Sequence, residues 1–206
     1  MVGRYPDFDV MQSADTWDDA TRAVVEQRLR SPTDLRFFDA AEAVTAAAFS
    51  DTVTAQDREP RVPVVAMIDK KYAESRHDGY RYDDMPDDAT TWHLALRGLD
   101  EVARRRYGSD FAGCPNEVRN AIVEQFAGGS LQGGVWDTFN CKRAFSVLMR
   151  GVLAEFYSHP WAWNEIGFGG PAYPRGYMRL GEGLREPHEK PEALQRDPVR
   201  DTETAR

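Results

Sequence analysis

The sequence has few cysteines and no long hydrophobic run, and both absences narrow its possible functions. Its two cysteines, Cys114 and Cys141, cannot hold a metal ion alone, and neither lies in the C-x-x-C-H pattern that attaches haem. They could form one disulfide in an exported protein, whereas two free buried thiols are expected in a cytoplasmic one. No segment approaches the roughly 20 consecutive apolar residues of a spanning helix, so we expect no direct membrane insertion.

Positive charge is also scarce. The formal net charge is −8, with 34 acidic residues against 26 lysines and arginines. The densest basic run, Arg104–Arg106, falls at the end of a predicted helix, where cations offset the helix dipole. Nucleic-acid binding needs a basic patch. No such patch is visible in the sequence, so we expect no nucleic-acid partner. Positions 1–9 resemble neither a secretory nor a twin-arginine signal. We therefore expect a cytoplasmic protein or, alternatively, a periplasmic one exported with a signal-bearing partner.

The motifs of common enzyme classes are missing. Gly167-Phe168-Gly169 lacks the third glycine of a dinucleotide site, and no predicted strand precedes it. A phosphate loop and the G-x-S-x-G motif are absent. The nearest approach to a metal motif is Glu155 with His159, four residues apart at a helix end. That pair is a weak candidate, since a histidine there also suits the helix dipole. We expect no catalytic and no cofactor-binding residue in this chain.

Helical periodicity, in contrast, runs through most of the chain. Asp39 and Glu42 have the spacing of a capping box, and no alternating strand pattern of useful length occurs. The expected helices are Ala20–Leu29, Ala40–Thr54, Val64–Glu74, one from Asp87 or Asp88 to Gly108, one from Pro115 to Gly128-Gly129, and one through Phe145–Phe156 that Pro160 must end. The fold class is therefore all-α, a compact bundle of about five or six helices.

Composition divides the chain into four parts. We expect an N-terminal arm over 1–12, a helical domain over 13–160, an irregular aromatic segment rich in glycine and proline over 161–180, and a tail over 181–206. The tail is charged and has almost no large apolar residues, so it cannot bury enough surface to offset its ordering entropy. Alone, it is expected to be flexible.

The aromatic segment is the strongest functional signal. Its large side chains, five within seventeen residues, are Trp161, Trp163, Phe168, Tyr173 and Tyr177. The glycines and prolines between them indicate an ordered but irregular path. Such a segment can fold back to cap the bundle, or it can supply rigid anchors for a partner interface. The residues alone favour neither use.

The same segment carries a family resemblance. The run SHPWAWNEIGFGGPAYPRGYMRL (Ser158–Leu180) resembles the end of the gluconate 2-dehydrogenase subunit 3 family, and three earlier runs resemble it in the same order. These are YPDFDVMQSADTWDDATRAVV, FFDAAEAVTAAAFSDTV and RVPVVAMIDKKYAESRHDGYRYDDMP. The resemblance covers roughly Tyr5–Leu180.

The resemblance implies a non-catalytic small subunit that supports the folding, stability or export of a larger one. The partner would be a flavoprotein of the glucose–methanol–choline oxidoreductase family, which holds the FAD, and some complexes add a cytochrome c subunit. Many relatives carry a twin-arginine signal, which this sequence lacks. The sugar or sugar acid, the electron acceptor and the stoichiometry do not follow from the resemblance.

Two other classes of function remain open at this stage. One is a metal-dependent helical enzyme that uses His77, His159 and nearby carboxylates. The other is a free-standing module that binds a sugar or lipid in an aromatic cleft.

Overall fold

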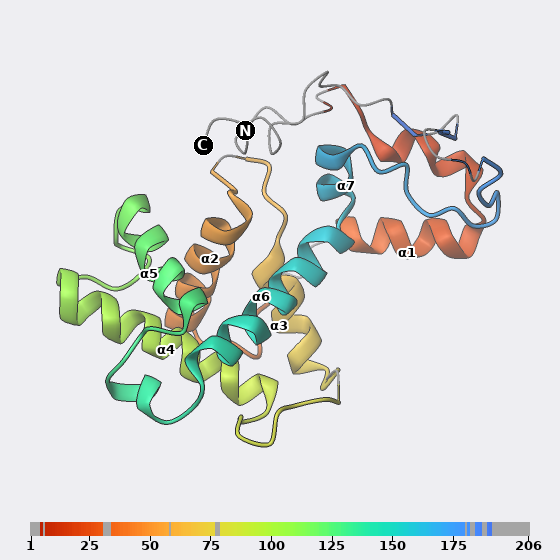
Figure 1. The fold of residues 1–206 in the computed structure, drawn as a ribbon. Helices are drawn as coiled ribbons and strands as arrows, with labels where there is room; N and C mark the ends of the chain where they lie inside the picture. The colour runs from red at the N-terminus through yellow and green to blue at the C-terminus, as the bar shows by residue number, and fades with distance from the viewer. Residues whose placement is uncertain are drawn as a thin grey trace. The chain divides into compact units, whose positions relative to one another are not determined.

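The computed structural model describes residues 5, 7–30, 34–57, 59–76, 79–179, 181, 184–186 and 189–190. Within them the chain forms seven α-helices, two 3-10 helices and no strand (Figure 1), which confirms the predicted all-α class. Most of the predicted tail over 181–206, and residues 1–4 and 6 of the predicted arm, lie outside the described residues. No helix in the described part has the length and apolar character that crossing a bilayer requires.

The helices group into two compact units, which do not coincide with the predicted division. Residues 31–156 form one unit, called here the middle unit. Residues 1–30 and 157–206 form the other, called the terminal unit because it contains both chain ends. The first predicted helix therefore groups with the aromatic segment, and each unit has its own buried residues.

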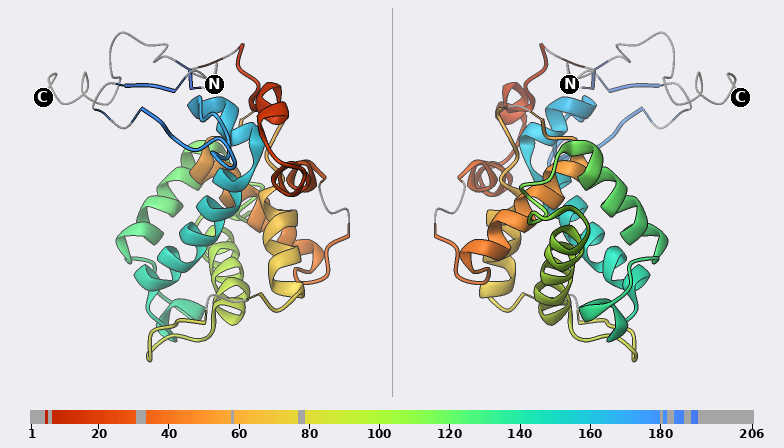
Figure 2. Two further views of the ribbon diagram at one scale, coloured as in Figure 1. Left: turned by 90° about the vertical axis from the view of Figure 1, so that its right-hand side faces the viewer. Right: turned by 90° about the vertical axis from the view of Figure 1, so that its left-hand side faces the viewer.

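The middle unit is built around α2. Its elements are α2 (Ala40–Thr54), α3 (Val64–Ala73), α4 (Asp88–Tyr107), α5 (Asn116–Gly128), the 3-10 helix η2 (Gly134–Asp137) and most of α6 (Cys141–Ser158). Helix α2 packs on α3, α4 and α5, and α4 also packs on α5 and η2 (Figure 2). The alanines of α2 permit this close packing on several neighbours, because they add little bulk between helix axes.

The ends of these helices follow from the residues that predicted them. Asp39 and Glu42 form the complete capping box at the start of α2. The Asp87 carboxylate accepts a hydrogen bond from the Thr90 N–H at 2.9 Å and caps α4. Gly108 ends α4 in the left-handed conformation. The predicted bounds of α2 and α4 are thus correct to within a residue or so.

An aromatic core fills the middle unit. Its largest fully buried side chains include Phe49, Trp92, Leu96, Phe111 and Phe126. At one point the packing requires a glycine, because a Cβ on Gly98 would lie 2.6 Å from the Trp136 ring. The Trp136 Nε1 donates to the Gly98 carbonyl at 3.1 Å, which fixes η2 on α4. The sequence did not predict η2, since four residues are too few to show a period.

A buried carboxylate organises the chain that leads into α2. Asp69 on α3 is only 1% exposed. Its Oδ1 accepts from the Arg36 N–H at 2.8 Å, and its Oδ2 accepts from the Phe37 and Phe38 N–H groups at 2.8 and 2.9 Å. These bonds give three consecutive backbone donors outside any helix a charged acceptor, and the buried Phe38 N–H is among them.

Replacing Asp69 should therefore destabilise the middle unit strongly. In Asp69→Ala the three backbone N–H groups lose their acceptor, so we expect the free energy of unfolding to fall by roughly 3 kcal/mol. Urea denaturation of the purified chain measures this change. The control is Asp34→Ala, an exposed aspartate close by in the sequence, for which a change within about 0.5 kcal/mol is expected. Equal effects in the two variants would contradict the capping role.

Candidate partner interface

The terminal unit combines the two ends of the sequence. It contains the 3-10 helix η1 (Val10–Thr16), α1 (Asp19–Leu29), α7 (Pro160–Ile166) and the segment 167–179. Asp18 caps the start of α1, because its carboxylate accepts from the Thr21 N–H at 2.8 Å. Helix α7 packs on both η1 and α1.

Helix α7 is a difference from the sequence prediction, which made the chain irregular from residue 161. Pro160 does end α6, at Ser158, but it also occupies the first turn of a new helix. Its fixed φ suits that position, and the His159 side chain caps the helix. Gly167 ends α7 in the left-handed conformation after seven residues. Only the part after Gly167 is irregular.

Trp163 belongs to the core of the terminal unit. It is 5% exposed, and its Nε1 donates to the Tyr157 carbonyl at 2.6 Å. The buried cluster around it consists of Phe8, Val10, Trp17 and Val25. Trp163 was predicted as a partner anchor together with its four aromatic neighbours. The structure corrects that role, because α7 turns this side chain onto η1 and α1 and away from the surface.

The other four predicted anchors are exposed. Trp161 and Phe168 are each 38% exposed, Tyr173 is 66% exposed and Tyr177 44%. The structure adds two apolar residues that the aromatic pattern did not identify, Ile166 and Met178. The exposed apolar side chains of this segment, called here the aromatic surface, are Trp161, Ile166, Phe168, Tyr173, Tyr177 and Met178. Such a density on one short segment is typical of an interaction site. Contact with a partner stays a prediction.

One ring contact and two hydrogen bonds hold the aromatic surface in place. The Phe168 ring meets the Trp163 ring edge to face at 5.5 Å. The Arg175 guanidinium donates to the Gly169 carbonyl at 2.9 Å, and this bond links two parts of the chain after α7. Further along, the Glu186 carboxylate accepts from the Met178 N–H at 2.6 Å. These side chains are therefore presented by an ordered backbone, which lowers the entropy cost of binding.

Two contacts connect residues 10–17 to α7 and the segment after it. The Asn164 Oδ1 accepts from the Val10 N–H at 2.8 Å. Gly170, with φ +79°, lies so close to Trp17 that a Cβ would come within 2.6 Å of its ring. Both the positive φ and the lack of space require glycine. Residues some 150 positions apart in the sequence thus form one structure.

His159 has a structural role in the described residues. It is fully buried, and its Nδ1 accepts from the Trp161 N–H at 3.2 Å. Burial lowers the pKa of His159 to about 4, an effect larger than the opposing contribution of the Arg28 backbone. The ring is therefore neutral at pH 7, with Nδ1 as the acceptor that caps α7.

No metal centre is visible among the residues that the structure covers. They include no group of three or more His, Cys, Asp or Glu side chains placed to hold an ion. The Glu155 and His159 pair stays an untested hypothesis, and His77 lies outside the described residues. Cys114 and Cys141 are unpaired and buried, and burial raises the pKa of both thiols. Neither is therefore activated as a nucleophile.

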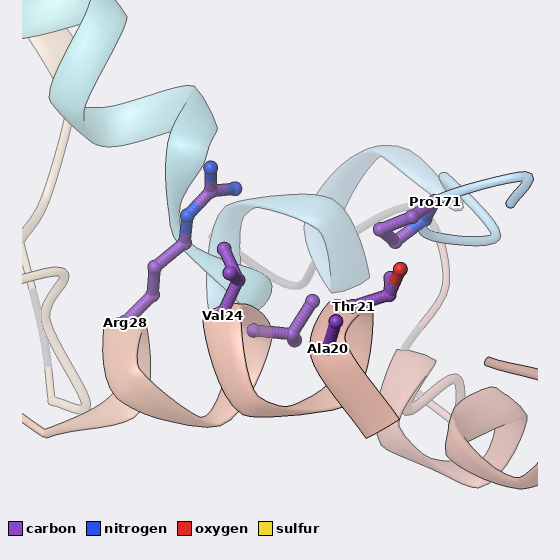
Figure 3. A pocket seen from close by; sticks show the side chains of 6 residues that line it. Ala20, Thr21, Val24, Arg28 and Pro171 are labelled. Atoms are coloured by element: carbon purple, nitrogen blue, oxygen red, sulfur yellow. The ribbon is translucent and has the colours of Figure 1, made fainter. Parts of the chain in front are cut away.

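A small cavity lies along α1 in the terminal unit. Its volume is about 300 Å³. The lining residues are Ala20, Thr21, Val24, Val25, Arg28 and Pro171 (Figure 3). Most of the lining is aliphatic, and Arg28 is the one charged side chain in it.

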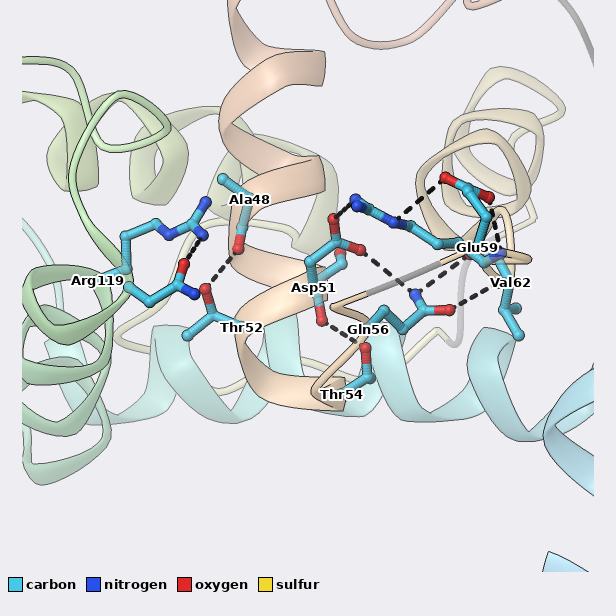
Figure 4. A network of polar contacts seen from close by, with 11 residues as sticks. Ala48, Asp51, Thr52, Thr54, Gln56, Glu59, Val62 and Arg119 are labelled. Carbon is cyan, nitrogen blue, oxygen red and sulfur yellow. Dashed lines mark hydrogen bonds and ion pairs between the residues drawn. The ribbon is translucent and has the colours of Figure 1, made fainter. Parts of the chain in front are cut away.

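A second cavity, of about 560 Å³, lies in the middle unit where α2 ends and α5 begins. Its lining is polar and includes Asp51, Arg61 and Arg119. Figure 4 shows the contacts there: Arg61 pairs with Asp51 at 2.6 Å, and the Gln56 Oε1 accepts from the Val62 N–H at 2.6 Å. Burial raises the pKa of Asp51 despite the nearby guanidinium. The network joins the end of α2 to the start of α3, which is a structural role.

The fold and the aromatic surface define a small helical protein with a candidate site for another protein. Residues 40–170 match the family model of gluconate 2-dehydrogenase subunit 3. This range is more than half of the chain, which therefore belongs to that family. Comparison with curated proteins and with solved structures gave no match.

The burial of Trp163 and the exposure of Tyr173 predict opposite effects of truncation. Trp163→Ala removes the ring from the core of the terminal unit, so we expect a loss of about 3–5 kcal/mol in the stability of that unit. Tyr173→Ala should change it by less than about 0.5 kcal/mol. Thermal unfolding followed by near-UV circular dichroism, with proteolysis at sites in 5–30, measures both. A Trp163 variant as stable as the parent would refute the proposed core.

The buried histidine predicts a pH dependence. The folded pKa of about 4 lies below the ordinary value of 6.5, so the unfolded state binds more protons between these values. The contribution of neutral His159 to the free energy of unfolding is complete above pH 6.5. It is lost as the pH falls toward 4, and the loss is at most about 3 kcal/mol. His159→Asn keeps a capping acceptor without a titrating ring. Unfolding measured between pH 7 and 4 should therefore have a shallower pH slope in this variant, and parallel slopes would count against the assignment.

Proposed function

We propose that this chain is a non-catalytic subunit of a flavin-dependent dehydrogenase complex and binds the larger subunit through the aromatic surface. The observation that carries the proposal is the concentration of exposed apolar side chains on an ordered segment of a chain from this family. The larger subunit would be of the glucose–methanol–choline type and would hold the FAD. A cytochrome c subunit fits the same proposal as an electron acceptor.

Binding through such a surface has a clear physical basis. Each exposed aromatic ring that becomes buried contributes about 25 cal/mol per Å² of apolar area. The backbone of the segment is already tied by Arg175 and Glu186, so little of this gain is spent on ordering. Interface energy is concentrated in a few aromatic anchors, which fits a surface whose six residues include two tyrosines, a tryptophan and a phenylalanine.

The role of the subunit is then to stabilise its partner. A protein that binds only the folded form of the larger subunit shifts that subunit's folding equilibrium by mass action. This function needs no active site in the small subunit. The oxidation of a sugar or sugar acid would take place entirely on the flavin of the larger subunit. We propose the cytoplasm as the compartment, with export beside a signal-bearing partner as the alternative.

The test is co-expression of this chain with the flavoprotein of the same genome, followed by affinity capture through a tag on this chain. The Tyr173→Ala, Tyr177→Ala double variant should weaken capture at least about 30-fold, because each lost anchor costs on the order of 1–2 kcal/mol. The matched control is Tyr80→Ala, Tyr107→Ala. These two tyrosines of the middle unit are 60% and 47% exposed, close to the 66% and 44% of the first pair.

The outcomes separate cleanly. Loss of capture in the first double variant alone, with unchanged circular dichroism, supports the proposal. Equal capture by both variants would remove the two tyrosines from the interface. Turnover of a sugar by the purified chain without flavin would contradict the non-catalytic role.

A further inference from the structure

The cavity along α1 is built from one face of that helix. Ala20, Val24 and Arg28 follow one another at intervals of four residues, so they form a single ridge. Val25 on the neighbouring row is buried in the core, whereas Val24 is 51% exposed. Figure 3 shows these side chains and Pro171 around the same space. The apolar part of the pocket is thus open to an incoming group.

Arg28 has a fixed position at one end of the pocket. Its Nη1 donates to the Ser158 carbonyl at 3.0 Å, and its guanidinium lies 5.7 Å from the centre of the Trp163 ring. The bond to Ser158 uses one of five N–H donors. A guanidinium held in this way presents a planar edge that pairs best with a carboxylate, through two parallel hydrogen bonds.

We propose that this pocket is a second docking point for the larger subunit. It receives one apolar side chain of that subunit, and a carboxylate close to that side chain in the larger subunit pairs with Arg28. The inference rests on the proposed function, because it names the same partner. It extends the contact surface from the segment after α7 onto α1, which lies outside the residues matched by the family model.

The dimensions favour a protein side chain over a small ligand. A volume of about 300 Å³ is at the lower end of small-molecule sites, which run from roughly 300 to 1,000 Å³ and bury about 70–90% of the ligand. Here the walls are one helix and one proline, so most of a free ligand would stay in water. A side chain carried by a larger protein does not need such enclosure, because the surrounding interface excludes the water.

Net charge disfavours a second copy of this chain as the occupant. Two copies, each with a formal net charge of −8, repel one another at low ionic strength. Arg28 requires only a local acidic group on the occupant. The partner segment should therefore contain an apolar residue with an aspartate or glutamate within a few positions.

Val24→Asp tests the apolar part of the pocket. The change places a carboxylate where an apolar side chain should sit, four residues before Arg28, so it disfavours the apolar group and can pair with Arg28 in place of the partner's carboxylate. It should therefore weaken capture of the larger subunit at least about tenfold. The matched control is Val44→Asp on α2, a valine that is 56% exposed against 51% for Val24. Both variants should retain their helical circular dichroism, because neither valine is buried.

The outcomes distinguish this inference from the proposed function. In one outcome the Tyr173→Ala, Tyr177→Ala variant loses the larger subunit, whereas Val24→Asp captures it as well as Val44→Asp does. The pocket is then not a docking point, and the proposed function stands. If the unsubstituted chain captures no flavoprotein at all, both proposals fail. If Val24→Asp loses capture and Val44→Asp keeps it, the inference is supported.

Photo-crosslinking identifies the occupant directly. A photoreactive residue in place of Gln27, which is exposed on α1 next to the pocket, should crosslink to the larger subunit in the assembled complex. Mass spectrometry of the product should return a peptide with an aspartate or glutamate near the crosslinked position. A crosslink to residues 191–206 of this chain or to a second copy would overturn the assignment of the occupant. A partner peptide without an acidic residue would overturn the role of Arg28.

Discussion

The burial of one indole ring supports the terminal unit. Trp163 belongs to a buried cluster whose other members come from the first 25 residues of the chain, and its N–H is satisfied by the Tyr157 carbonyl. Without that ring, η1 and α1 would have little to pack against, because their remaining buried side chains are few. Phe168, the first exposed ring after α7, is positioned by the same indole through an edge-to-face contact.

The helices of the middle unit could be predicted from local chemistry alone. The capping box of Asp39 and Glu42, the Asp87 cap and the left-handed Gly108 act within one helical turn, so the sequence contains all the information needed to place them. The role of Asp69 could not be predicted in this way. Its three partners lie about thirty residues away, and only the folded arrangement brings them to its carboxylate.

The candidate interface shows a sharper limit of sequence reasoning. Trp161 and Trp163 stand two positions apart in the same glycine- and proline-rich run, yet one is exposed and the other buried. Composition treats them alike. The short helix α7 separates them, since residues two apart on a helix face in different directions. That helix was not predicted because Pro160 was interpreted only as a stop for α6, whereas proline also suits a first turn.

The pairing of Val10 with Asn164, across 154 positions, has a consequence for the order of events during synthesis. Residues 31–156 are complete as a compact unit before the ribosome has made α7, and domains generally fold as units while the chain emerges. The segment before residue 31 therefore has no packing partner until α7 has been synthesised. The surface with which this protein is proposed to recognise its companion is thus formed only after the middle unit is complete.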